Sequence, residues 1–95
     1  MPIPRSVDTR PLAQNHPRPQ YTEEARANNT QGQVQARVLV GADGLVKEVI
    51  IIRGLPDGLN EAAVSALRKS KFKPATLGGV DVPYWLALEV EFNLR

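Results

Sequence analysis

The chain has 95 residues, of which 42% are hydrophobic and 23% charged, and its formal net charge is +2 at pH 7. This length supports one hydrophobic core, and the composition is that of a globular domain rather than of a disordered chain. The sequence holds no cysteine and only five aromatic residues, and its basic residues are spread out. We therefore expect no disulfide, no zinc–thiolate site and no nucleic-acid partner. Nor does any stretch approach the roughly 18 apolar residues that a membrane-spanning helix needs.

The first part of the chain is rich in proline, and its apolar residues follow neither helical nor alternating spacing. Proline removes backbone donors and disfavours helix, so we expect residues 1–16 to form an extended arm or linker. His16 is the single histidine and lies among prolines, where a linker role explains it better than a role as general base. The prolines within residues 1–20 are Pro2, Pro4, Pro11, Pro17 and Pro19.

A short helix is expected over residues 22–28. Thr22 is suited to the N-cap, and Glu23 and Glu24 fall in the first turn, where carboxylates complement the helix dipole. Turn-forming residues that end at Gly32 stop this helix.

A β-hairpin follows. Apolar residues alternate from Val34 to Val40, which predicts a strand with one buried face. Asp43-Gly44 separates this strand from a second apolar run, Val46 to Ile52, and is a typical hairpin turn. The residues Val49–Ile52 are apolar on both faces, so this strand is either covered on both sides or exposes a patch.

A second helix is expected over residues 61–70, with Asn60 as its N-cap. Leu59 and Val64 then stand at the positions of a hydrophobic staple, one residue before the cap and four after it. Its buried stripe is expected to comprise Ala63, Val64 and Leu67.

The last part of the chain has the clearest pattern, because every even-numbered position from 82 to 94 is apolar. This alternation predicts one long strand with a buried face. The apolar positions are Val82, Tyr84, Leu86, Leu88, Val90, Phe92 and Leu94.

This order of elements predicts an α+β fold: a three-stranded antiparallel sheet of order 2-1-3 with two helices on one face. The second helix returns the chain parallel to the second strand, so the last strand can pair antiparallel only with the first and becomes an edge. An apolar edge invites aggregation or a partner strand. Pro83, Glu89 and Glu91 would blunt such an edge, whereas in the alternative reading an extended peptide adds to it by β-augmentation.

Several blocks of the sequence, in their order and spacing, resemble the TonB C-terminal domain family over about residues 17–95. The resemblance implies a periplasmic domain that couples inner-membrane proton-motive force, through an ExbB/ExbD-type motor, to outer-membrane transporters of siderophores, haem or cobalamin. It also implies that the full-length protein has an N-terminal inner-membrane anchor and a proline-rich spacer before this domain. The blocks are Pro19-Gln20-Tyr21, Ala25-Arg26, Gly32-Gln33-Val34, Gly41 to Val46, Asn60 to Ala63, Lys71 to Ala75 and Phe92-Asn93-Leu94.

The resemblance further implies that the TonB box of a transporter is held as an added strand against the last strand, with help from the segment before the first helix. The sequence departs from the family's usual pattern at Arg18, Thr22 and Ser70, where glutamine, proline and tryptophan are common, and these departures bear on which partner is served. The residues that the resemblance implies to bind the TonB box are Arg18, Pro19, Gln20, Tyr21, Tyr84, Trp85, Leu86, Ala87, Leu88, Glu89 and Val90.

We expect neither enzymatic activity nor a cofactor or metal site. Asp43, Asp57 and Asp81 lack the spacing of metal ligands and suit turns instead. The segments 41–44 and 77–79 lack the Lys-Ser/Thr pair of a phosphate loop, so they too are expected to be turns. Two alternatives to transport remain: a TonB-like or TolA-like interaction module of a larger sensory or structural envelope protein, and strand-exchanged dimerisation through the free edge.

Overall fold

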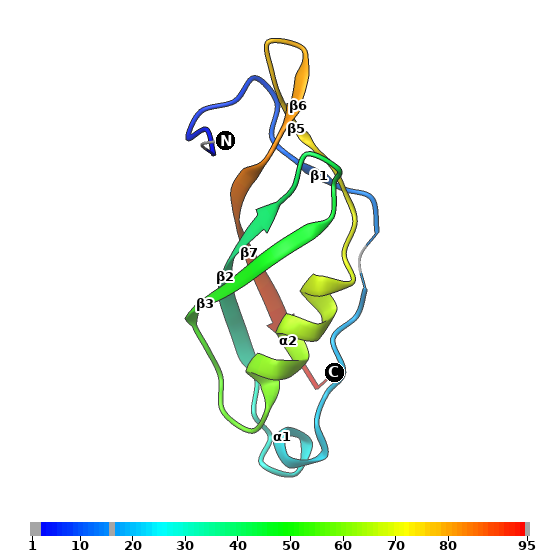
Figure 1. Ribbon diagram of the computed structural model, residues 1–95. Coiled ribbons are helices and arrows are strands. Elements are labelled where there is room, and N and C mark those ends of the chain that lie inside the picture. The colour runs from blue at the N-terminus through cyan, green and yellow to red at the C-terminus, as the bar shows by residue number, and fades with distance from the viewer. Residues whose placement is uncertain (1–2, 16, 95) are drawn as a thin grey trace.

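The computed structural model describes residues 3–15 and 17–94 and has the expected α+β architecture (Figure 1). His16, which the sequence indicates to be a linker residue, lies outside the described residues. The elements in chain order are β1 (Leu12–Ala13), α1 (Glu23–Ala27), β2 (Gly32–Val40), β3 (Val46–Arg53), α2 (Leu59–Arg68), β4 (Phe72–Lys73), β5 (Ala75–Leu77), β6 (Val80–Val82) and β7 (Tyr84–Phe92).

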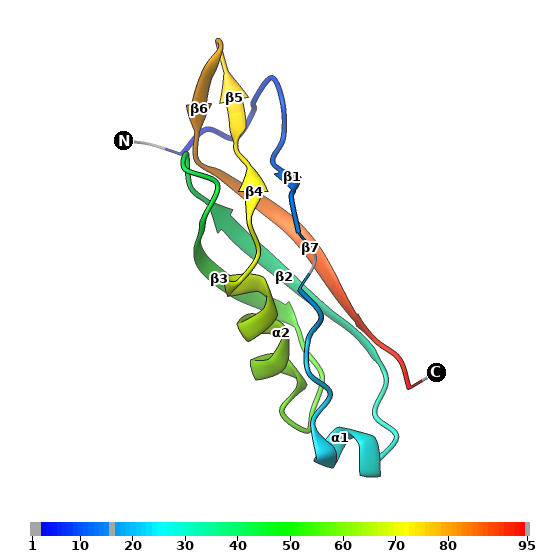
Figure 2. The same cartoon turned by 90° about the vertical axis from the view of Figure 1, so that its right-hand side faces the viewer.

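The main sheet has three antiparallel strands in the order β3-β2-β7, which confirms the predicted order 2-1-3. β2 and β7 pair in one unbroken register from Gly32 opposite Phe92 to Val40 opposite Tyr84. The pairing of β2 with β3 instead shifts register at two places. α2 lies across one face of the sheet, and α1 lies beyond its lower end (Figures 1 and 2).

The core lies between α2 and the sheet, because alternate residues of β2 all point to that side. α1 joins the same core through Ala25, so both helices serve one face, as predicted. The buried residues that fill this core include Ala25, Val34, Ala36, Val38, Val40, Leu59, Ala63, Leu67, Phe72 and Phe92.

No helix in the described part of the chain covers the opposite face of the sheet. On β3, Ile50 and Ile52 remain 44% and 59% exposed, whereas Val49 and Ile51 are partly buried. Of the two readings of the apolar run on this strand, the exposed patch is therefore the one that the fold adopts.

α1 begins as predicted. The Thr22 hydroxyl accepts a hydrogen bond from the Ala25 amide at 3.0 Å, which satisfies one of the free donors of the first turn. The same hydroxyl donates to the Asp57 carbonyl at 2.6 Å. Thr22 thus ties the start of α1 to the loop that precedes α2.

The predicted start of α2 was wrong. Its N-cap is Gly58, which has a left-handed backbone (φ 79°) and no capping side chain. Asn60 lies within the first turn, and its side-chain oxygen accepts from the Leu55 amide at 2.9 Å, closing the preceding loop. Leu59 is fully buried inside the helix, so there is no hydrophobic staple. Val64 is only half-buried, and Leu59 and Ala66 complete the stripe in its place.

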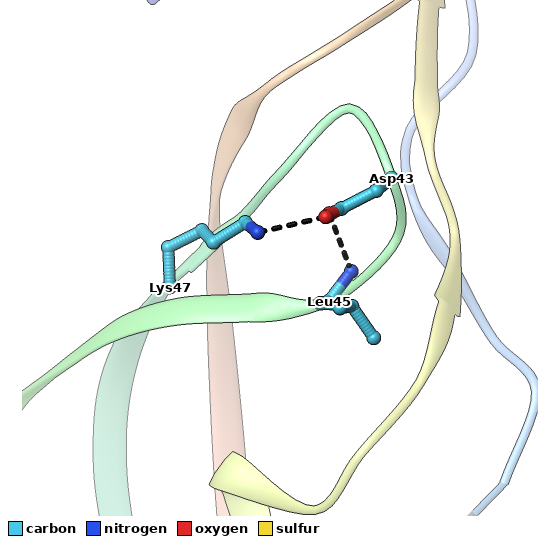
Figure 3. Close-up of polar contacts among 3 residues, drawn as sticks. All are labelled: Asp43, Leu45 and Lys47. Carbon is cyan, nitrogen blue, oxygen red and sulfur yellow. Dashed lines mark hydrogen bonds and ion pairs between the residues drawn. The ribbon is translucent and has the colours of Figure 1, made fainter.

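The hairpin turn between β2 and β3 was predicted correctly and is closed by one side chain. The Asp43 carboxylate accepts from the Leu45 amide at 3.0 Å and pairs with the Lys47 ammonium at 2.7 Å (Figure 3). These contacts lower the pKa of Asp43 below its ordinary value, and the hydrogen bond from Lys47 has the largest effect. Gly44 is left-handed (φ 82°), and its carbonyl accepts from the Phe72 amide at 2.9 Å, which joins the turn to β4.

The prediction of one strand over residues 82–94 was also wrong. Val80–Val82 forms β6, which pairs with β5 across the turn at Gly78 and Gly79, and β7 begins only after Pro83. Proline has no N–H and interrupts a ladder, so the chain changes partner there. The alternation keeps the same period across Pro83, and for this reason it could not reveal the change.

The arm lies against the domain (Figure 2). Its β1 pairs antiparallel with β4, Leu12 opposite Lys73 and Ala13 opposite Phe72. The Asp8 amide donates to the Thr76 carbonyl at 2.8 Å, and the Lys71 amide donates to the Asn15 side chain at 2.9 Å. The arm residues 8–15 therefore run alongside residues 71–76.

Candidate functional site at the free edge of the sheet

The outer edge of β7 has no strand beside it in the described part of the chain. β7 pairs with β2 alone, and none of the backbone hydrogen bonds made by turns and loops among residues 3–15 and 17–94 reaches residues 84–92. Every second N–H and C=O of an edge strand points away from its neighbour. A row of main-chain donors and acceptors thus faces outward along β7.

The side chains of β7 divide between the two faces of the sheet. Leu88 and Val90 pack toward α2 and are half-buried, whereas Ala87 and Glu89 are exposed on the open face. On that face the Glu89 carboxylate accepts a hydrogen bond from the side-chain amide of Gln35 at 3.3 Å. A strand added to β7 would meet apolar groups on one side and carboxylates on the other.

The upper end of β7 lies near the beginning of the arm. Tyr84 and Trp85 are half-buried, and with Arg37 they line a hollow that Ile3 and Pro4 also border. Of the predicted strand residues, Leu86 packs toward the core with Leu88 and Val90.

A groove with a volume of about 270 Å³ runs along the α2 side of the β7 edge. Three parts of the chain enclose it: the C-terminal half of α2 with the segment that follows it, residues 88–91 of β7, and the segment formed by residues 13–15 and 17–19. Its lining comprises Ala13, Asn15, Pro17, Pro19, Ala66, Leu67, Ser70, Phe72, Leu88, Glu89, Val90 and Glu91.

The predicted residues before α1 do not all face this edge. Pro19 lines the groove, whereas Arg18 and Gln20 are exposed to solvent. The Tyr21 ring stacks edge-on against Phe92 with 5.6 Å between ring centres, and its hydroxyl donates to the Thr30 carbonyl. Tyr21 therefore anchors the segment before α1 to the end of β7.

Several groove residues were missed by sequence reasoning. Ser70, Phe72 and Ala13 come from regions that the alternation on β7 does not touch, and only the folded chain brings them to its edge. The small size of Ala66 and Ser70, near the end of a helix that packs beside the strand, is the one sequence signal that could have indicated open space.

Clusters of charged or metal-ligating side chains are scarce in residues 3–15 and 17–94. Among these residues, no group of three His, Cys, Asp or Glu side chains is placed to hold a metal ion, and the ion pair of Asp43 with Lys47 is the single salt bridge. None of the helices in that part of the chain is long and apolar enough to cross a membrane.

A straight, uncapped edge strand beside an apolar groove is typical of small interaction domains that take up an extended segment of another chain. The sequence profile of the family described as "Gram-negative bacterial TonB protein C-terminal" matches residues 17–94. The chain belongs to this family, which confirms the resemblance drawn from the sequence.

Two similar proteins extend this result. The chain is 27% identical over 93 residues to "Protein TonB" of Vibrio cholerae serotype O1 (strain ATCC 39315 / El Tor Inaba N16961), covering 97% of this chain and 38% of that protein. It thus spans about two fifths of the length of this curated relative. The fold is similar to the solution NMR structure of the Pseudomonas aeruginosa TonB CTD, with a TM-score of 0.73, 20% identity, and coverage of 93% of this chain and 90% of that one.

Proposed function

We propose that this chain is the periplasmic docking domain of an energy transducer, and that β7 binds the TonB box of outer-membrane transporters by strand addition. Family membership and the uncapped outer edge of β7 support this proposal. The ladder is made by Tyr84 to Val90, and the segment Arg18 to Tyr21 borders its lower end. The full-length protein is anchored in the inner membrane and driven by an ExbB/ExbD-type motor, and the transporters carry siderophores, haem or cobalamin.

Docking of this kind depends mainly on the backbone. Each main-chain hydrogen bond contributes only about 0.5–1.5 kcal/mol net, but an added strand forms several in parallel. Because these bonds involve no side chains of the peptide, one edge can serve several transporters. Side chains beside the edge then decide which sequences bind best.

The same geometry suits the transmission of force. A strand pulled along its own axis loads all its ladder bonds together rather than one after another. β7 is itself well held, since it pairs with β2 along its whole length and buries Phe92 to 1% exposure. Under tension the added peptide therefore separates from β7 before β7 leaves the sheet.

Proline substitutions test the proposal. In an antiparallel strand successive residues direct their N–H groups to opposite edges, so those of Trp85 and Leu88 point in opposite directions. One of the two substitutions, Trp85→Pro or Leu88→Pro, removes an N–H that bonds to β2 and therefore disrupts the sheet. The other removes an N–H that points away from β2 and leaves the sheet intact.

We expect the variant that keeps a native-like amide spectrum to lose TonB-box binding by at least about tenfold, because the ladder is broken and the proline ring obstructs the edge. Binding would be measured by pull-down and by titration with TonB-box peptides. A folded variant that binds like the unsubstituted chain would refute strand addition at β7.

A further inference from the structure

The groove beside β7 lies where alternate side chains of an added strand must go. A docked strand runs about 4.8 Å from β7, and its side chains point in turn to the two faces of the sheet. Those on the α2 side fall next to Leu88 and Val90, which line the groove. Its opposite wall is the arm, held in place by the pairing of β1 with β4.

The groove lining is mostly apolar, with Asn15, Ser70, Glu89 and Glu91 as its polar members, and the groove has room for a side chain. Ala66 and Leu67 supply its helix wall, and Phe72, which is buried, also lines it. Ser70 is 8% exposed, and its hydroxyl donates to the Ala66 carbonyl at 3.2 Å, so this donor is already used. Among the described residues no buried side-chain polar atom lacks a partner. A polar group packed against the apolar part of the lining, Ala66, Leu67 and Phe72, would therefore lose its hydration without compensation.

The other face of the docked strand meets different chemistry. Glu89 and Glu91 border the groove, but they alternate with Leu88 and Val90 along β7, and both are exposed. No salt bridge in the described residues neutralises them. Opposite charges on directly paired strand positions attract, and like charges repel. Basic side chains on the open face of the docked peptide are thus favoured over acidic ones.

From this arrangement we infer, on the basis of the proposed function, that the groove is a side-chain pocket that selects the docked peptide. The preferred ligand is an extended segment in which a bulky aliphatic residue faces α2 and basic or polar residues face Glu89 and Glu91. Ser70 determines the selection, because its small side chain leaves the pocket open. Ala13, on the arm, closes the pocket from the other side and lies before the residues that the family profile matches.

A set of synthetic peptides tests this inference. The parent peptide alternates Ala and Lys. Each further peptide carries a single Leu at a different position, so the test does not depend on knowing which peptide residue lies opposite which residue of β7. We expect Leu at positions facing the groove to bind about tenfold more tightly than Ala, since burying the extra methylene groups stabilises the complex. Affinity would be measured by calorimetry, and the site by amide chemical shifts of residues 84–90.

The decisive variant is Ser70→Trp, which fills the pocket. We expect it to bring the Leu-to-Ala affinity ratio close to one while the all-Ala/Lys peptide keeps its affinity within about twofold. Ser65→Trp is the matched control, because Ser65 is exposed on α2 outside the groove lining, and it should keep the preference for Leu. Ala13→Trp fills the pocket from the arm and gives the same test if Ser70→Trp does not fold.

The outcomes separate the two proposals. If the peptides shift β7 amides but show no preference for Leu, or if folded Ser70→Trp and Ala13→Trp retain that preference, the pocket is refuted and strand addition stands. If no peptide shifts the amides of residues 84–90, strand addition and the pocket fail together.

Discussion

The two edges of the same sheet differ in a way that indicates where a partner docks. β3 pairs with β2 through two register shifts and exposes Lys47, Glu48 and Arg53. β7 pairs with β2 without any shift, and its edge borders the apolar groove. Bulges and charged side chains are the usual means by which proteins protect an edge from other strands.

This difference shows that the residues of each edge strand, and not the fold as a whole, determine whether the edge can accept another strand. β3 carries both kinds of protection, whereas β7 carries charges at Glu89 and Glu91 but keeps a straight ladder. Of the two edge strands, only β7 therefore presents a regular row of main-chain donors and acceptors to an incoming peptide.

The largest effect is expected from the residue that holds β7 in place. Phe92 is 1% exposed and packs on Tyr21, so Phe92→Ala should lower the free energy of unfolding by about 3–5 kcal/mol. Ile52 on β3 is 59% exposed, and Ile52→Ala should cost less than about 1 kcal/mol. Urea denaturation compares the two, and similar losses would show that β7 is not anchored as described.

The turns that lead into the two edge strands should respond next. Gly44, before β3, is left-handed, and a Cβ there would clash with the Phe72 carbonyl oxygen. Gly79, in the hairpin before β7, is also left-handed but has no atom within 4 Å of such a Cβ. We expect Gly44→Ala to cost about 3 kcal/mol and Gly79→Ala about 1 kcal/mol in thermal or urea unfolding. Equal costs would contradict the close contact between the β2–β3 turn and β4.

Charge reversal should affect docking at one edge only. With a Lys-containing peptide, Glu89→Lys is expected to weaken binding about threefold at low salt, and the effect should fade as salt screens the charges. Glu48→Lys on β3 is the matched control and should leave affinity unchanged. An equal effect of the two substitutions would mean that the charge acts at a distance and not on a strand paired with β7.

The smallest effect concerns the β2–β3 turn in acid. The folded-state pKa of Asp43 is lowered by its hydrogen bonds to Lys47 and the Leu45 amide. Its contribution to stability is therefore present above the ordinary carboxyl pKa of about 4 and is lost as pH falls through the lower, folded value. Asp43→Asn should shift the urea midpoint slightly at neutral pH and not at all in strong acid. A difference that persists in acid would rule out this ion pair as its source.

Much of the fold could be predicted because it depends on patterns of residues that are close together in the sequence. The alternation from Val34 to Val40, the Asp43-Gly44 turn and the Thr22 cap each depend on residues close in sequence. The start of α2 could not be predicted in this way, because Asn60 bonds back to Leu55 and leaves the capping position to Gly58. The short strands β1, β4, β5 and β6 also depend on pairing between distant segments.

The candidate site divides in the same manner. The alternation over residues 82–94 indicated a strand with one buried face, and the order of the elements indicated that this strand is an edge. The family resemblance pointed to the segment before α1. Neither could show that Tyr21 would turn toward Phe92 while Pro19 faces the groove. The groove itself requires the arm and the end of α2 to meet beside β7, and no local pattern encodes that meeting.

Amide hydrogen exchange along the two edge strands, with and without a bound TonB-box peptide, is the most direct measurement. We expect every second amide between Tyr84 and Val90 to exchange rapidly in the free domain and to become protected when the peptide binds, while the β3 amides stay unchanged. Protection of all β7 amides before any peptide is added, or protection that arises on β3 instead, would contradict docking at the β7 edge.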